Sequence, residues 1–423
     1  MASLGRFLFL GLILIGAFGA SAQVIDLAPA KPNPHVHYDR LKRVDDLMTQ
    51  FVQEKKIPGA VLLVLKDGQV LRHQAYGMDD ADAPKPMAKE ALFRIASQTK
   101  AITSVGIMLL LEEGKLLLTD PVSKYIPAFA KPVVLDKFNA ADSSYTTVPA
   151  KREITIKDLL THTSGLGYAQ IGSPTMNAIY AKNQITAGIG ELKANLPETM
   201  ARLGKAPLEY QPGTRWNYSL SSDVLGYVIE VVSGMSLEAF FQQRLFTPLG
   251  MKDTYFNVPA SKHSRLSALN TQDSLGNWHK IPDSSEFPAS FPNQTTSYFS
   301  GGAGLTSTAL DYGIFLQMLL NKGRYGGKII LSPRIVEMMT VNQVGKLMGE
   351  RQFGLGFGIV PESAPDEVQS PETFSWGGAF ATNYWVDPQK KIVFQLMTQQ
   401  YPASPYLEEL RAKLSVAIYQ SLK

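Results

Sequence analysis

Apolar runs near both ends of the chain predict β-strands. Residues 59–65 and 70–76 are two such runs, and the Asp67-Gly68 pair between them is a strong signal for a β-hairpin. Close to the C-terminus, residues 383–386 and 391–397 repeat the pattern around a second turn. The chain therefore begins and ends with strands.

The middle of the chain has helical periodicity instead. From Ser97 to position 111 the apolar residues recur at helical spacing, and Gly114 ends the pattern. A second helix is predicted over 223–232, and a final amphipathic helix over about 406–422. Strands at both ends with helices between them suggest a sheet assembled from both termini and a helical lobe inserted in the middle. The two termini must then lie close together.

The N-terminus has the features of an export signal. Arg6 precedes an apolar run over 7–18, and small residues follow at 19–22. This pattern predicts a secretory signal peptide over residues 1–22, cleaved between Ala22 and Gln23. The alternative is a membrane anchor, but the run is shorter than the roughly 20 residues that span a bilayer. We therefore expect an exported protein, periplasmic or secreted by a bacterium, with no membrane span after cleavage.

Composition removes several classes of function. The chain has 423 residues with 41 Lys and Arg against 37 Asp and Glu, a formal charge of +4 that is too slight to imply a nucleic-acid partner. There is no cysteine, which excludes thiol catalysis and thiolate metal sites. The six histidines show no metal-binding spacing, so we expect no metal and no cofactor.

The strongest chemical signal is the tetrapeptide Ser97-Gln98-Thr99-Lys100, where the strand-rich start gives way to a helix. A serine hydroxyl is a weak nucleophile until a base takes its proton, and residues three apart on a helix share a face. Lys100 would thus lie beside Ser97, and burial could keep its amine neutral enough to act as that base. The alternative is a serine that merely caps a helix, but Ser97 is the only serine in the chain with a lysine three positions on.

Several blocks in a fixed order accompany this pair. An ordered set of Ser-x-x-Lys, a Tyr-led segment and a late Gly-containing strand is the signature of serine β-lactamases and penicillin-binding proteins. The sequence resembles this family, particularly its class C-like branch, over nearly all of the mature chain. The resembling blocks are residues 93–100, 159–166, 212–219, 249–256, 301–305 and 375–378.

The resemblance implies roles for individual residues. Ser97 matches the acylated serine, Lys100 its base partner, and Tyr218 the tyrosine that shuttles the proton and later activates water. A literal Tyr-x-Asn occurs elsewhere, at Tyr255-Phe256-Asn257, but we reject it because its block looks like a structural strand. His162 in the second block is expected to position a turn near the site.

Two departures from the lactamase pattern concern the substrate. Leu220 replaces the asparagine that follows the tyrosine by two residues, and Trp376 replaces the lysine or histidine that leads the last triplet, Trp376-Gly377-Gly378. Both changes make the substrate-binding residues more apolar and resemble the carboxylesterase branch (family VIII-like). The backbone N–H groups of Ser97 and Ala379 are expected to form the oxyanion hole.

The resemblance implies an α/β (mixed α+β) fold, with an antiparallel sheet from both termini flanked by helices and a mainly helical lobe. After a leader segment over 23–40, we expect one catalytic domain over 41–423, with a sheet lobe over about 41–96 and 325–423 and a helical lobe over about 97–324. The expected function is a serine hydrolase that forms an acyl-enzyme on Ser97, with small uncharged esters as substrates. The alternatives are a β-lactamase or D-amino-acid peptidase, an acyltransferase, and a non-catalytic cell-wall-binding relative.

Overall fold

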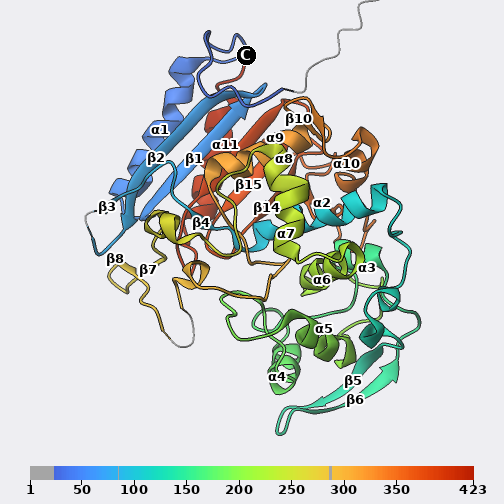
Figure 1. Ribbon diagram of the computed structural model, residues 1–423. Helices are drawn as coiled ribbons and strands as arrows, with labels where there is room; N and C mark the ends of the chain where they lie inside the picture. The colour runs from blue at the N-terminus through green and yellow to red at the C-terminus, as the bar shows by residue number, and fades with distance from the viewer. Residues whose placement is uncertain (1–22, 84, 285–287) are drawn as a thin grey trace, which may run out of the picture.

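The largest element of the fold is an eight-stranded antiparallel sheet. A computed structural model describes residues 23–83, 85–284 and 288–423, so the predicted signal peptide lies outside the described residues (Figure 1). In spatial order the strands are β12 (Gln352–Phe353), β13 (Gly358–Ile359), β14 (Phe374–Gly377), β15 (Asn383–Asp387), β16 (Ile392–Met397), β1 (Gly59–Lys66), β2 (Gln69–Asp80) and β3 (Lys85–Pro86).

Both ends of the chain contribute to this sheet, as the sequence predicts. β1 lies between β2 and β16, and every residue of β1 is buried because helices cover both faces. The backbone N–H of His37 donates to the carbonyl of Ser421 at 2.7 Å, and that of Lys423 donates to His35 at 2.9 Å. The ends of the described chain are therefore in contact, as expected, and Figure 1 shows the C-terminus beside the blue N-terminal segment.

Helices from distant parts of the chain cover the sheet. α1 (Tyr38–Gln53) and α11 (Leu407–Tyr419) share one hydrophobic core with one face of the sheet. α9 (Ala309–Leu320) packs on the other face, where Gly313 lets the helix approach Leu63 of β1, since a Cβ there would lie 2.3 Å from the leucine side chain. α9 falls inside the range predicted for the helical lobe yet belongs to the sheet side. The expected leader 23–40 likewise runs into the first turn of α1.

The rest of the chain forms the helical region and four small hairpins or strand pairs. The remaining helices are α2 (Thr99–Glu112), α3 (Ile156–Leu160), α4 (Pro174–Lys182), α5 (Leu196–Lys205), α6 (Ser221–Ser233), α7 (Leu237–Phe241), α8 (Thr247–Leu249) and α10 (Pro333–Met339). The small strand pairs are β4 (Phe93–Arg94) with β9 (Thr306–Ser307), β5 (Val133–Asn139) with β6 (Ser144–Pro149), β7 (Asn270–Gln272) with β8 (Trp278–Lys280), and β10 (Arg324–Tyr325) with β11 (Lys328–Ile329).

The helix α2 lies at the centre of the molecule and carries the predicted lysine. It is apolar on nearly all sides and buried almost throughout, as expected for a helix inside a large core. Gly106 lets α6 and α7 come close, because a Cβ there would lie 2.8 Å from Ile229 and 3.1 Å from Phe241. The start of α2 is thereby fixed in position by packing from several sides.

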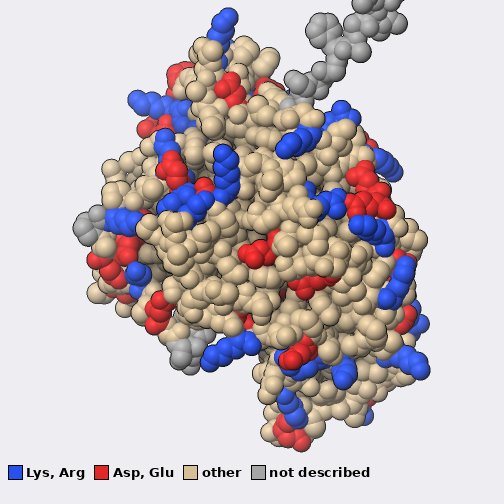
Figure 2. Space-filling model, viewed as in Figure 1, with Lys and Arg blue, Asp and Glu red and all other residues tan. Residues whose placement is uncertain are grey.

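Charged side chains of both signs are interspersed on the face shown in Figure 2. Among the described residues no single helix is long and apolar enough to cross a bilayer; α6 together with the segment 237–249 reaches that length only as a pair bent by 79°.

Candidate active site

Ser97 lies in a single 3₁₀ turn, Ala96–Gln98, that connects β4 to α2. The residue before it, Ala96, has φ of +42°, a left-handed conformation that non-glycine residues seldom adopt and that costs on the order of 1–3 kcal/mol. Ala96 and Gln98 are buried, whereas Ser97 is partly exposed. The turn therefore presents the serine to the solvent side while the core holds both neighbours.

Lys100 lies beside Ser97, as its spacing predicts. Its Nζ donates to Ser97 Oγ at 3.2 Å, to the carbonyl of Gly302 at 2.8 Å and to the hydroxyl of Tyr168 at 3.4 Å. The side chain is 2% exposed, so these contacts replace water around the amine. All three hydrogens of an ammonium group have an acceptor in this arrangement.

The charge state of Lys100 differs from the one expected from burial alone. Burial opposes the ammonium form, but the phenols of Tyr168 and Tyr218 and the carboxylate of Asp223 outweigh it and hold the pKa of Lys100 above its ordinary value. A lysine that keeps its proton cannot take the proton of Ser97. Lys100 instead places a positive charge beside Ser97 and the two tyrosines. Burial raises the pKa of the Tyr168 hydroxyl, and the charge of Lys100 opposes that shift.

Two tyrosines surround this charge. The ring centre of Tyr218 lies 4.7 Å from Lys100 Nζ, and the ring of Tyr168 stacks on that of Tyr218 at 5.6 Å with an interplanar angle of 20°. Tyr218 is the residue that the family blocks indicate. Tyr168 was not predicted, although it follows the end of the second block by two positions.

Asp223 is, like Tyr168, a residue of the site that was not predicted; the sequence indicated it only as the start of a helix. It is fully buried on the first turn of α6, and its Oδ1 accepts from Ser300 Oγ at 2.5 Å and from the backbone N–H of Gly302 at 3.4 Å. Burial raises the pKa of Asp223, and the charge of Lys100 opposes that shift. Gly302 lies between the two charges and offers its carbonyl to Lys100 and its N–H to Asp223. The sequence signal that could have indicated a role for Asp223 is a carboxylate within an otherwise apolar helix.

Trp376 on β14 forms the wall opposite the tyrosines. Its ring centre is 5.6 Å from that of Tyr218 and 5.4 Å from that of Phe353. At the end of β14, Gly378 approaches the turn before Ser97 so closely that a Cβ would lie 2.4 Å from the carbonyl oxygen of Ile95. This contact places the triplet next to the serine, with Ala379 exposed one residue further on. The oxyanion hole itself stays a prediction.

Leu220, predicted to bind substrate, and Tyr255, rejected as the catalytic tyrosine, both lie away from Ser97. The side chain of Leu220 is fully buried in the core at the start of α6, so it offers no surface to a ligand in this structure. The hydroxyl of Tyr255 donates to the carbonyl of Lys252 and accepts from Lys262 Nζ at 2.5 Å, away from Lys100. Only Tyr218 of the two tyrosines considered lies with Ser97.

The ring of His162 packs against the ring of Tyr218. Its ring centre is 4.9 Å from that of Tyr218, and its Nδ1 lies 3.2 Å from the hydroxyl of Ser219. Its carbonyl also accepts from the backbone N–H of Asn217 at 2.8 Å. Burial, together with the charge of Lys100, lowers the pKa of His162 from 6.5 to about 3. The imidazole therefore stays neutral at any working pH.

This buried neutral imidazole predicts acid sensitivity. Because the folded pKa is depressed, the unfolded chain binds a proton that the folded chain does not, so stability falls as pH drops from about 6.5 towards 3. At about pH 5 the expected loss from this group is roughly 2 kcal/mol. His162→Asn, which tolerates the φ of +54° at this position, should reduce the loss of unfolding free energy between pH 7.5 and 5, measured by urea titration. The exposed His35→Asn is the control, and an unchanged acid loss in His162→Asn would contradict the assignment.

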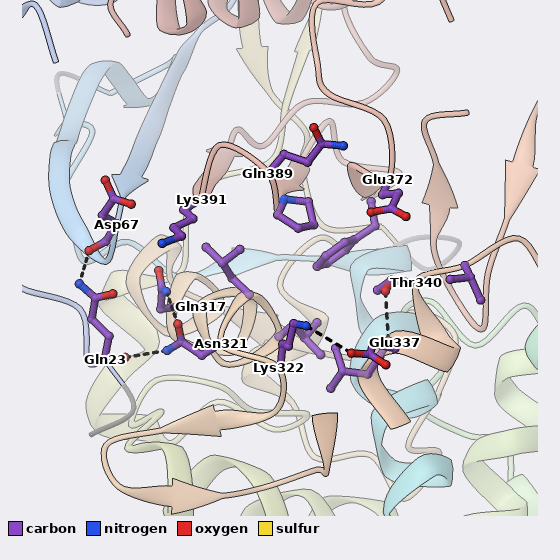
Figure 3. A pocket seen from close by; sticks show the side chains of 16 residues that line it. Gln23, Asp67, Gln317, Asn321, Lys322, Glu337, Thr340, Glu372, Gln389 and Lys391 are labelled. Atoms are coloured by element: carbon purple, nitrogen blue, oxygen red, sulfur yellow. Dashed lines mark hydrogen bonds and ion pairs between the residues drawn. The ribbon is translucent and has the colours of Figure 1, made fainter. Parts of the chain in front are cut away.

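A cavity of about 500 Å³ on the sheet side is separate from this site (Figure 3). It is lined by polar and charged side chains of α9, α10 and the turn between β15 and β16, among them Lys322, Glu337 and Lys391. None of the residues around Ser97 lines it.

Comparison with known proteins agrees with the fold and the blocks. The family model described as Beta-lactamase matches residues 44–417. Esterase EstB of Burkholderia gladioli is 31% identical over 84% of this chain and 89% of its own length, and Protein Rv1367c of Mycobacterium tuberculosis is 34% identical over 82% and 86%. The solved structure of EstCE1, described as a hydrolase with promiscuous acyltransferase activity, superimposes with a TM-score of 0.77 at 27% identity, covering 90% of this chain and 99% of EstCE1.

The sheet, the central helix and the Ser97–Lys100 pair thus define a β-lactamase-fold serine hydrolase. The chain belongs to the beta-lactamase family, and the predicted fold class and family are confirmed.

Proposed function

We propose that this chain is an exported carboxylesterase that forms an acyl-enzyme on Ser97 and acts on small uncharged esters. The observation that carries this proposal is the contact of the Trp376 indole with Tyr218, at 5.6 Å between ring centres. The resemblance implies a cation at this position in enzymes that bind the carboxylate of a β-lactam or a peptide. The esterase EstB, which is similar over most of both chains, also supports it.

The geometry suggests how the residues share the chemistry. Tyr218, which lies beside the ammonium of Lys100, is the group that takes the proton of Ser97 in this proposal as the hydroxyl attacks the ester carbonyl. The backbone N–H groups of Ser97 and Ala379 receive the developing oxyanion. Tyr218 then gives its proton to the leaving alkoxide, and the same groups activate the water that hydrolyses the acyl-enzyme.

The charges near Trp376 argue against an anionic substrate. Arg351 lies along the same wall, where it could reach a carboxylate, but it is outnumbered by Glu350, Asp366 and Glu367. All four are exposed and therefore screened by water. A buried carboxylate without a partner costs several kcal/mol, whereas an uncharged ester needs only the oxyanion hole and an apolar wall.

A direct comparison of substrates tests this proposal. We expect kcat/KM for p-nitrophenyl acetate to exceed that for nitrocefin by at least about 100-fold, equivalent to roughly 2.7 kcal/mol of transition-state binding. Trp376→Lys should narrow this gap, measured as the ratio of the two kcat/KM values in one preparation. Efficient nitrocefin turnover by the wild type, with only comparable ester hydrolysis, would mean that the chain is a β-lactamase.

Acyl transfer to an alcohol is the second candidate. It is favoured by the similarity to EstCE1, whose description names a promiscuous acyltransferase activity. In both reactions the acyl group passes through Ser97, and they differ only in whether water or an alcohol accepts it. Adding methanol to the assay and quantifying the methyl ester formed separates them.

A further inference from the structure

A cavity of about 530 Å³ adjoins the aromatic wall of the site. Its aromatic residues contact one another: Phe353 lies 5.6 Å from Trp216 and 5.4 Å from Trp376. The lining also includes the segment after β13, with Pro361 and Ala364. The volume of the whole cavity falls within the range of ligand pockets, about 300–1,000 Å³.

The position of the cavity relative to Tyr218 indicates which part of an ester it faces. The ring of Tyr218 stacks on Trp216 at 6.2 Å with an angle of 21° and contacts Trp376 at 5.6 Å. Tyr218 is also the group that would protonate the leaving oxygen. An alcohol attached to that oxygen can reach the two indoles that contact Tyr218, and both indoles line the cavity.

We propose that this cavity binds the alcohol part of the substrate, and that the preferred substrates are esters of bulky, uncharged aromatic alcohols. The proposal rests on the acyl-Ser97 esterase function and adds the substrate class. The aromatic rings offer edge and face contacts to another ring. The cation in the described lining is Arg351, which is exposed, so water screens the charge that it could offer to an anionic alcohol.

Two isomeric esters separate the alcohol side from the acyl side. 2-Naphthylmethyl acetate carries its ring on the alcohol, and methyl 2-naphthylacetate carries the same ring on the acyl group. We expect kcat/KM of the wild type to favour the first isomer by at least about 10-fold, a ratio typical of filling one apolar pocket. The two isomers form different acyl-enzymes, so kcat/KM, which reports acylation and does not depend on deacylation, is the quantity to compare.

Filling the cavity should remove this preference. Gly358 has room for a side chain, because a Cβ there would lie 3.6 Å from the ring of Trp376 and 3.5 Å from the carbonyl of Ser375. Two variants place a leucine side chain in the cavity, Gly358→Leu and Ala364→Leu. Each should lower the ratio of the two kcat/KM values by at least about fivefold. Ala412→Leu introduces the same side chain at an exposed position of α11 and serves as the control. Melting temperatures show whether each variant is folded.

The outcomes distinguish this proposal from the function on which it rests. A wild type that favours methyl 2-naphthylacetate, or a ratio that neither folded cavity variant changes, would overturn the substrate class while leaving the esterase intact. If neither isomer is hydrolysed and no acyl group forms on Ser97, the proposed function itself fails.

Discussion

Ser97→Ala is expected to lower kcat for ester hydrolysis by at least about 10⁴-fold, the loss seen when the nucleophile of a serine hydrolase is removed. Without the hydroxyl no acyl-enzyme forms, and the charge of Lys100 and the phenol of Tyr218 have no nucleophile to activate. The melting temperature should change by only a few degrees, because Ser97 is partly exposed and its side chain contacts Lys100 alone among the hydrogen bonds described.

Mass spectrometry locates the reacting residue. Wild-type protein treated with a slow ester should carry the acyl group on the peptide that contains Ser97, and Ser97→Ala should carry none. Ser104→Ala is a matched control, since Ser104 is a buried serine on α2, one turn beyond Lys100. An acyl group found on any other serine would refute the assignment of the nucleophile.

Local patterns were sufficient for the main strands and helices. The runs predicted over 59–65 and 70–76 correspond to β1 (Gly59–Lys66) and β2 (Gln69–Asp80), because alternation and an Asp-Gly turn act within a few residues. The sheet edge formed by β12 and β13 was not predicted. These strands are two residues long and exist only through pairing with one another and with β14, which a local pattern does not encode.

In the site, too, some contacts follow from local sequence spacing and others only from tertiary packing. Ser97 and Lys100 are three residues apart, so helix geometry alone brings them together at 3.2 Å. Tyr168 and Asp223 reach Lys100 only through tertiary packing, and nothing in the local sequence fixes that distance. Leu220 shows the opposite limit: it is two residues from Tyr218, but the chain turns into α6 there and sends the side chain into the core.

Lys100→Ala and Tyr218→Phe are each expected to lower kcat by at least about 10³-fold, and the double variant should be within about 10-fold of the worse single one. Lys100 acts through its positive charge on Tyr218, whose ring centre lies 4.7 Å from Lys100 Nζ. Once either group is lost, the other no longer activates Ser97, so the effects cannot multiply. Steady-state kinetics on one p-nitrophenyl ester measure all three variants.

Two further tyrosine variants make this test specific. Tyr255→Phe is the control, because its hydroxyl bonds to Lys252 and Lys262 and not to the site. Tyr168→Phe is the discriminating variant, because the Tyr168 hydroxyl lies 3.4 Å from Lys100 Nζ and stacking alone would survive the change. If Tyr168→Phe lowers kcat more than Tyr218→Phe does, the base is Tyr168. If the losses in the Lys100 and Tyr218 variants multiply to about 10⁶-fold, the two residues act independently, and Lys100 must have a role other than assisting Tyr218.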